Sequence, residues 1–114
     1  MSIAITGLNA QNLMVNGDLE SWDNSTTPTG WDVFDNVTQD DVVVFEGIYS
    51  AAQMSDNSSQ KLRQDVYNIV GRQEYTISYY YLDNSTTAKT RIWSYWMDNG
   101  TYLDDDEEVL RPSE

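Results

Sequence analysis

The chain has 114 residues, a formal net charge of −13, 12% aromatic residues, no cysteine and no histidine. This length suits a single domain with a modest core, and the negative charge argues against nucleic acid or an anionic membrane as a partner. Without histidine or cysteine, the chain lacks an imidazole base, a thiol nucleophile, disulfides and the usual zinc ligands. We therefore expect one module spanning residues 1–114.

The first eleven residues, "MSIAITGLNAQ", are predicted to form a flexible N-terminal segment. They lack the basic start and long apolar stretch of a signal peptide. A secreted protein without its leader would look the same. No apolar run in the chain approaches the ~18 residues of a membrane span.

The rest of the chain reads as short strands. Apolar and polar residues alternate in runs bounded by Asn, Asp, Gly, Ser and Thr clusters, which predicts strands rather than helices. The predicted strands are Asn12–Val15, Leu19–Trp22, Trp31–Phe34, Val42–Glu46, Ser50–Met54, Lys61–Tyr67, Glu74–Leu82, Lys89–Met97 and Thr101–Leu103. Their spacing predicts an antiparallel β-sandwich or jelly roll. Asn99-Gly100 predicts a tight hairpin, because both residues tolerate a positive φ.

An acidic run follows that hairpin. The stretch "LDDDEEV", Leu103–Val109, interrupts the strand pattern and lacks the spacing of an EF-hand calcium loop. We expect residues 104–114 to be a solvated acidic loop or a truncated end.

Alternation sorts the last aromatic strand, "TRIWSYWM", into two faces. Arginine is rarely buried without a partner. We therefore expect Arg91, Trp93 and Tyr95 to face outward, and Ile92 and Trp96 to face the core.

Four stretches carry a resemblance to known proteins. They are "NLMVNGDLESW…PTGW" from Asn12, "FEGIYSAAQM" at Phe45–Met54, "LRQDVYNIVGRQEYTISYYYLDN" at Leu62–Asn84, and "TRIWSYW". In order and spacing, they resemble carbohydrate-binding modules of families four, nine and twenty-two, as found in accessory modules of secreted Bacteroidetes enzymes. The resemblance covers roughly Asn12 to Leu103.

The resemblance implies a galactose-binding-like jelly roll with Tyr75, Ile77 and Tyr79 in its core. It also implies an extracellular or cell-surface, non-catalytic module that holds a secreted enzyme or surface protein at a polysaccharide. Such modules often carry a structural calcium, which here would involve Glu20 with help near Glu46 and Gly47. Family members continue through further strands, so either the sandwich is incomplete at its C-terminus or the fold differs from that of the family.

The outward row suits a neutral or cationic glycan. The C–H-rich face of a pyranose stacks on an aromatic ring, and the donors of arginine reach its hydroxyl groups. Tyr80 and Arg63 are expected to extend the row formed by Arg91, Trp93 and Tyr95 from neighbouring strands. The alternative is a sandwich with aromatics on both faces, one of them covered by further strands or a partner domain. Trp22 and Trp31 are expected to be core residues or loop anchors.

An enzyme is not expected. The 19 acidic residues show no spacing that singles out an acid–base pair, and a shallow sandwich offers little pocket to raise a carboxyl pKa. The alternative function is a structural or protein-interaction module, in which open sheet edges accept strands from another chain and give an oligomer.

Overall fold

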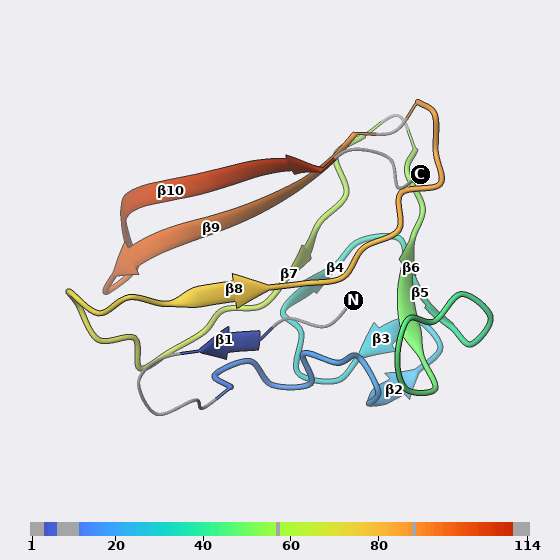
Figure 1. Cartoon of the computed structure of the whole chain (residues 1–114), viewed down its shortest axis with the longest axis horizontal. Helices are drawn as coiled ribbons and strands as arrows, with labels where there is room; N and C mark the ends of the chain where they lie inside the picture. The colour runs from blue at the N-terminus through green and yellow to red at the C-terminus, as the bar shows by residue number, and fades with distance from the viewer. Residues whose placement is uncertain (1–3, 7–11, 57, 88, 111–114) are drawn as a thin grey trace. The chain divides into compact units, whose positions relative to one another are not determined.

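The computed structural model describes residues 4–6, 12–56, 58–87 and 89–110, and these residues form ten strands and no helix (Figure 1). The strands pair into five two-stranded antiparallel sheets. The pairs are β1 (Ala4–Thr6) with β8 (Thr76–Ser78), β2 (Trp22–Asn24) with β3 (Thr27–Pro28), β4 (Val33–Phe34) with β7 (Leu62–Arg63), β5 (Val37–Asp40) with β6 (Ser50–Gln53), and β9 (Thr90–Asp98) with β10 (Thr101–Leu110). The all-β class is confirmed, and the antiparallel pairing is consistent with a β-sandwich.

The chain divides into two compact units, Met1–Tyr80 and Tyr81–Glu114. The first unit contains β1 to β8, and the second contains the β9–β10 hairpin. No helix in the described part of the chain has the length and apolar character needed to cross a membrane.

Two predicted strands are instead turns or bends. In Asn12–Val15, the Asn12 side chain accepts the Met14 N–H at 3.0 Å. In Val42–Glu46, Asp40 Oδ1 accepts the N–H groups of Val42 and Val43 at 2.8 and 3.3 Å. These backbone N–H groups donate to nearby side chains and so do not donate to a neighbouring strand. The strand Val37–Asp40 was not predicted, and it lies next to β6 through its pairing with Ser50–Gln53.

The predicted hairpin at Asn99-Gly100 is confirmed. Asn99 and Gly100 have φ values of 49° and 82°, as a turn of this kind requires. The β9–β10 ladder continues from Asp98 opposite Thr101 to Thr90 opposite Leu110, with a register shift between Tyr102 and Asp104.

The predictions for both ends of the chain need correction. Residues 104–110 are part of strand β10 rather than a loop, because the tight turn sets a backbone register that side-chain charge does not prevent. In the N-terminal segment predicted to be flexible, Ala4–Thr6 forms β1. The other residues of 1–11, and residues 111–114, lie outside the described part of the chain.

The core of the first unit is small. Leu19, Pro28, Trp31 and Val37 are buried there. The predicted core row on β8 is not buried: Tyr75 and Tyr79 are half-buried and Ile77 is 36% exposed. Among the described ladders, β8 pairs only with the three-residue β1, and pairing within a sheet does not cover the face that carries this row.

Candidate functional site

The side chain of Asn16 stabilises the turn that precedes Glu20 in the first unit. Its side-chain amide donates to the carbonyl oxygens of Ser21 and Thr29, both at 2.8 Å, and its Oδ1 accepts the Ser21 N–H at 2.9 Å. Asn16 has a φ of 51°, a left-handed conformation that asparagine tolerates better than most residues. The residue therefore ties the turn before Glu20 to the chain entering and leaving the β2–β3 hairpin.

Two tryptophans anchor the same turn. The indole N–H of Trp22 donates to the Leu19 carbonyl at 2.6 Å, and that of Trp31 donates to the Asn16 carbonyl at 3.1 Å. Trp31 is buried and Trp22 is half-buried. The predicted core or loop-anchoring role of these two residues is confirmed.

Glu20 reaches across 28 residues to the loop between β5 and β6. Its carboxylate accepts the Ile48 N–H at 2.9 and 3.1 Å and the Tyr49 N–H at 3.2 Å. Gly47 has a φ of 81°, and a Cβ atom built on it would collide with the Glu20 carboxylate. The absence of a side chain at Gly47 thus lets the carboxylate lie against the backbone amides.

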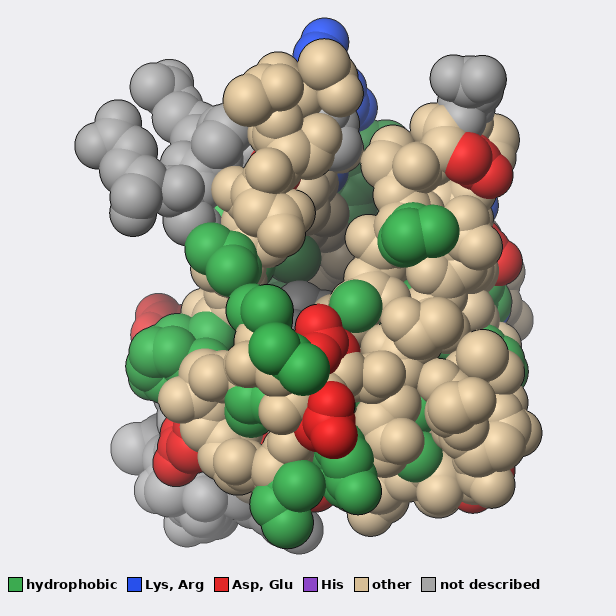
Figure 2. All heavy atoms as spheres, turned by 90° about the vertical axis from the view of Figure 1, so that its right-hand side faces the viewer, with side chains coloured by type: hydrophobic (Ala, Val, Ile, Leu, Met, Phe, Trp, Pro, Cys, Tyr) green, Lys and Arg blue, Asp and Glu red, His purple; other side chains and the backbone are tan. Residues whose placement is uncertain are grey.

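A pocket of about 290 Å³ opens beside this contact. Three acidic residues, Asp18, Glu20 and Glu46, line it together with Phe45, Gly47, Tyr49, Ser50 and Tyr80, all in the first unit. The rings of Phe45 and Tyr80 are stacked, with centroids 4.0 Å apart and planes 18° apart. Figure 2 shows the side of the molecule that carries the β5–β6 loop, where acidic side chains lie next to hydrophobic ones.

The structure brings Glu20, Glu46 and Gly47, the three predicted calcium ligands, to one pocket. Calcium takes six to eight oxygen ligands. Among the described residues, no three Asp or Glu side chains converge closely enough to hold a metal ion. The Glu20 carboxylate instead accepts backbone N–H groups, so calcium binding stays a prediction based on the resemblance.

Calcium binding is tested by thermal unfolding. The resemblance predicts that millimolar calcium raises the melting temperature of EGTA-treated protein, because a ligand bound only by the folded state stabilises it. A gain of 1 kcal/mol in a chain of this size corresponds to about 4–8 °C. Glu20→Gln should abolish the rise. An unchanged melting temperature in the unmodified protein would show that the amide contacts hold Glu20 without a cation.

The predicted outward row lies on β9, in the second unit. Arg91 is exposed, Trp93 is 47% exposed and Tyr95 is 49% exposed, whereas Ile92 and Trp96 are half-buried. The alternation expected from the sequence is therefore confirmed. The inward residues are only partly covered rather than buried in a core.

The rings of this row form an edge-to-face series. The centroids of Trp93 and Tyr95 are 5.6 Å apart, with planes at 89°, and those of Tyr95 and Tyr102 are 6.1 Å apart, with planes at 64°. Tyr102 is opposite Met97 in the ladder, so its contact with Tyr95 is diagonal. The row is thus a corrugated strip of separate rings rather than one flat platform.

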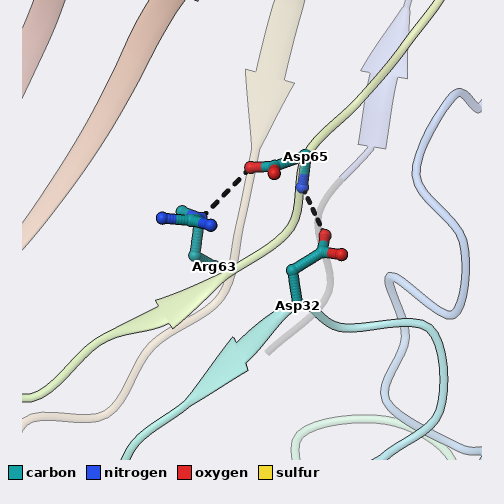
Figure 3. Close-up of polar contacts among 3 residues, drawn as sticks. All are labelled: Asp32, Arg63 and Asp65. Atoms are coloured by element: carbon teal, nitrogen blue, oxygen red, sulfur yellow. Dashed lines mark hydrogen bonds and ion pairs between the residues drawn. The ribbon is translucent and has the colours of Figure 1, made fainter. Parts of the chain in front are cut away.

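The two residues expected to extend this row lie elsewhere in the sheet pairing. Arg63 is on β7, whose partner is β4, while the partner of β9 is β10. Arg63 Nε forms an ion pair with Asp65 at 3.1 Å, and the Asp65 N–H donates to Asp32 at 2.7 Å (Figure 3). Tyr80 follows β8 and stacks on Phe45 in the pocket wall. None of the described ladders joins β7 or β8 to β9, so the extension of the row by Arg63 and Tyr80 stays a prediction.

No individual role was predicted for Asn16, Asp18 or Phe45, although all three lie within the stretches that carry the resemblance. The sequence offers one signal for the role of Asn16, because Asn before Gly favours a turn with positive φ. Phe45 carried none, since its contact with Tyr80 depends on tertiary structure.

Comparison of the chain with protein-family models, with curated proteins and with solved structures found no match. The structure itself defines an all-β chain with two aromatic surfaces. One is the row on β9, and the other is the Phe45–Tyr80 pair beside the acidic pocket.

Proposed function

We propose that the protein is a non-catalytic carbohydrate-binding module of the jelly-roll type, located outside the cell or at its surface, which holds an enzyme or a surface protein at a polysaccharide. The observation that carries this proposal is the exposed row Arg91, Trp93 and Tyr95 on β9. Large aromatic side chains normally stabilise proteins by being buried. A row of them about half exposed on one strand favours a ligand-binding surface.

The chemistry of the row suits a sugar. Each aromatic ring can stack on the C–H face of a pyranose, and a guanidinium can donate several hydrogen bonds to hydroxyl groups. The edge-to-face arrangement of Trp93 and Tyr95 offers separate rings to successive positions along a glycan. Trp93 has the largest ring of the row, so it is the residue expected to contribute most to binding.

Affinity electrophoresis of the whole chain, in native gels containing β-glucan, xylan, mannan or chitosan, tests the proposal. We expect at least one polysaccharide to retard the protein, and Trp93→Ala to lower that affinity at least about tenfold, or ~1.4 kcal/mol. Since Trp93 is 47% exposed, its replacement should leave the melting temperature nearly unchanged.

Tyr67→Ala is the matched control, because Tyr67 is 75% exposed and lies outside the row. It should leave retardation intact. Equal losses in the Trp93 and Tyr67 variants, or no retardation by any polysaccharide, would contradict the proposal.

A second candidate function, a protein-interaction module completed by strands of another chain, is favoured by a different observation. Eighteen large hydrophobic residues among the described ones are exposed, and every described sheet has only two strands. Open edges and exposed apolar surface are the features that β-augmentation uses. Light scattering separates the two functions: an obligate oligomer that no glycan retards would favour the second, and a glycan-binding monomer the first.

A further inference from the structure

We propose that the pocket between Glu20 and the Phe45–Tyr80 pair binds a protonated amino-sugar unit of a glycan, with its ammonium group at the carboxylates and its pyranose ring against the aromatic pair. The inference deepens the proposed function, on which it rests, because it names a class of glycan and a binding site separate from the β9 row.

The charge of the pocket favours a cation. Three of the eight lining residues, Asp18, Glu20 and Glu46, are acidic, and none of the eight is basic. The amides of Ile48 and Tyr49 partly compensate the charge of Glu20. Asp18 and Glu46 are exposed, so their charges are available to a ligand. The net charge of −13 adds a field that attracts cations and repels anions.

The aromatic wall favours a ligand with an apolar face. Phe45 is 71% exposed and Tyr80 is 50% exposed, although the two rings are stacked. Stacking uses one face of each ring, and the remaining aromatic surface can contact the C–H face of a sugar or a cation. The volume of about 290 Å³ is just below the ~300–1,000 Å³ typical of ligand pockets, which suits a single sugar unit.

An amino sugar combines both requirements in one ring. A neutral sugar would stack on the rings but leave the carboxylates without a charged partner. A lysine side chain would supply the ammonium group but has no flat face to place against Phe45 and Tyr80. These alternatives make the ligand class testable with compounds that differ in one group.

The experiment measures the affinity of the whole chain for the hexamer of β-1,4-linked glucosamine and for its neutral N-acetylated counterpart, by isothermal titration calorimetry in EGTA. The two share a backbone and differ at the nitrogen, which is a charged ammonium group in one and a neutral acetamide in the other. We expect the glucosamine hexamer to bind at least about tenfold more tightly, or ~1.4 kcal/mol. Glu46→Gln should reduce this preference to less than about threefold, or ~0.7 kcal/mol, and Phe45→Ala should weaken the binding of both hexamers.

Three controls distinguish the pocket from other sources of binding. Asp41→Asn removes one exposed charge from the same loop, outside the pocket, and should keep the preference; a loss equal to that of Glu46→Gln would assign the effect to net charge and overturn the inference. Trp93→Ala should weaken both hexamers and leave their ratio unchanged. Competition by a lysine pentapeptide as strong as by glucosamine oligomers would assign the pocket to peptide ammonium groups instead.

The failure of this inference can be told apart from failure of the proposed function. Equal affinity for the two hexamers, with both weakened by Trp93→Ala, would overturn the amino-sugar pocket and keep the module. If neither hexamer binds, the pocket inference is overturned; the module stands only if another polysaccharide retards the protein.

Discussion

Asn16→Ala is expected to lower the free energy of unfolding by about 3 kcal/mol. The substitution removes three side-chain hydrogen bonds, to Ser21 and Thr29, that typically contribute about 1 kcal/mol each. It also places an alanine at a φ of 51°, where a left-handed conformation costs about 1 kcal/mol. Partial solvent exposure of these bonds offsets some of the sum. Urea denaturation followed by tryptophan fluorescence measures the change, since Trp22 and Trp31 report on this turn.

Two further variants separate the contributions at Asn16. Asn16→Gly accepts the positive φ but loses the hydrogen bonds, so it should be less damaging than alanine by about 1 kcal/mol. Asn68 has a φ of 62°, and the described residues show no hydrogen bond to its side chain. Asn68→Ala should therefore lower the free energy of unfolding only by the about 1 kcal/mol that a left-handed conformation costs alanine. A loss at Asn68 as large as that at Asn16 would contradict the assigned role of the side-chain bonds.

Gly47→Ala is expected to destabilise the protein by about 3 kcal/mol and to displace the Glu20 carboxylate. The new methyl group would occupy the position of that carboxylate, and the φ of 81° is unfavourable for alanine. Hydrogen bonds between a charged group and backbone amides contribute about 1.5–3 kcal/mol. Their loss at Ile48 and Tyr49 would free the β5–β6 loop from the turn that precedes β2.

A double-mutant cycle with Glu20→Ala tests the mechanism. If the methyl group acts by expelling the carboxylate, the two substitutions together should cost much less than their sum. Gly71→Ala is the control for adding a methyl group where it meets no other described atom and the φ is not positive. Among the described atoms none lies within 4 Å of a Cβ built there, so it should change stability by less than about 0.5 kcal/mol. Additive losses at Glu20 and Gly47 would show that backbone strain alone explains the effect.

Several features could be predicted from the sequence because they depend on neighbours along the chain. The hairpin at Asn99-Gly100 follows from residues that accept positive φ, and the exposure of Trp93 and Tyr95 follows from strand alternation. Trp31 was expected to be a core or anchoring residue, and it is buried. The strands predicted at Asn12–Val15 and Val42–Glu46 do not form. There the side chains of Asn12 and Asp40 accept hydrogen bonds from nearby backbone N–H groups, which competes with strand pairing.

What the sequence by itself determined is the all-β class, the last hairpin and the two faces of β9, because turn preference and side-chain alternation are local. Only the tertiary structure decided that Tyr80 stacks on Phe45 and that the Glu20 carboxylate lies on the amides of Ile48 and Tyr49. These contacts join residues whose separation along the chain leaves no periodic signal. They form because folding brings a carboxylate, a glycine without a side chain and two aromatic rings to the same pocket.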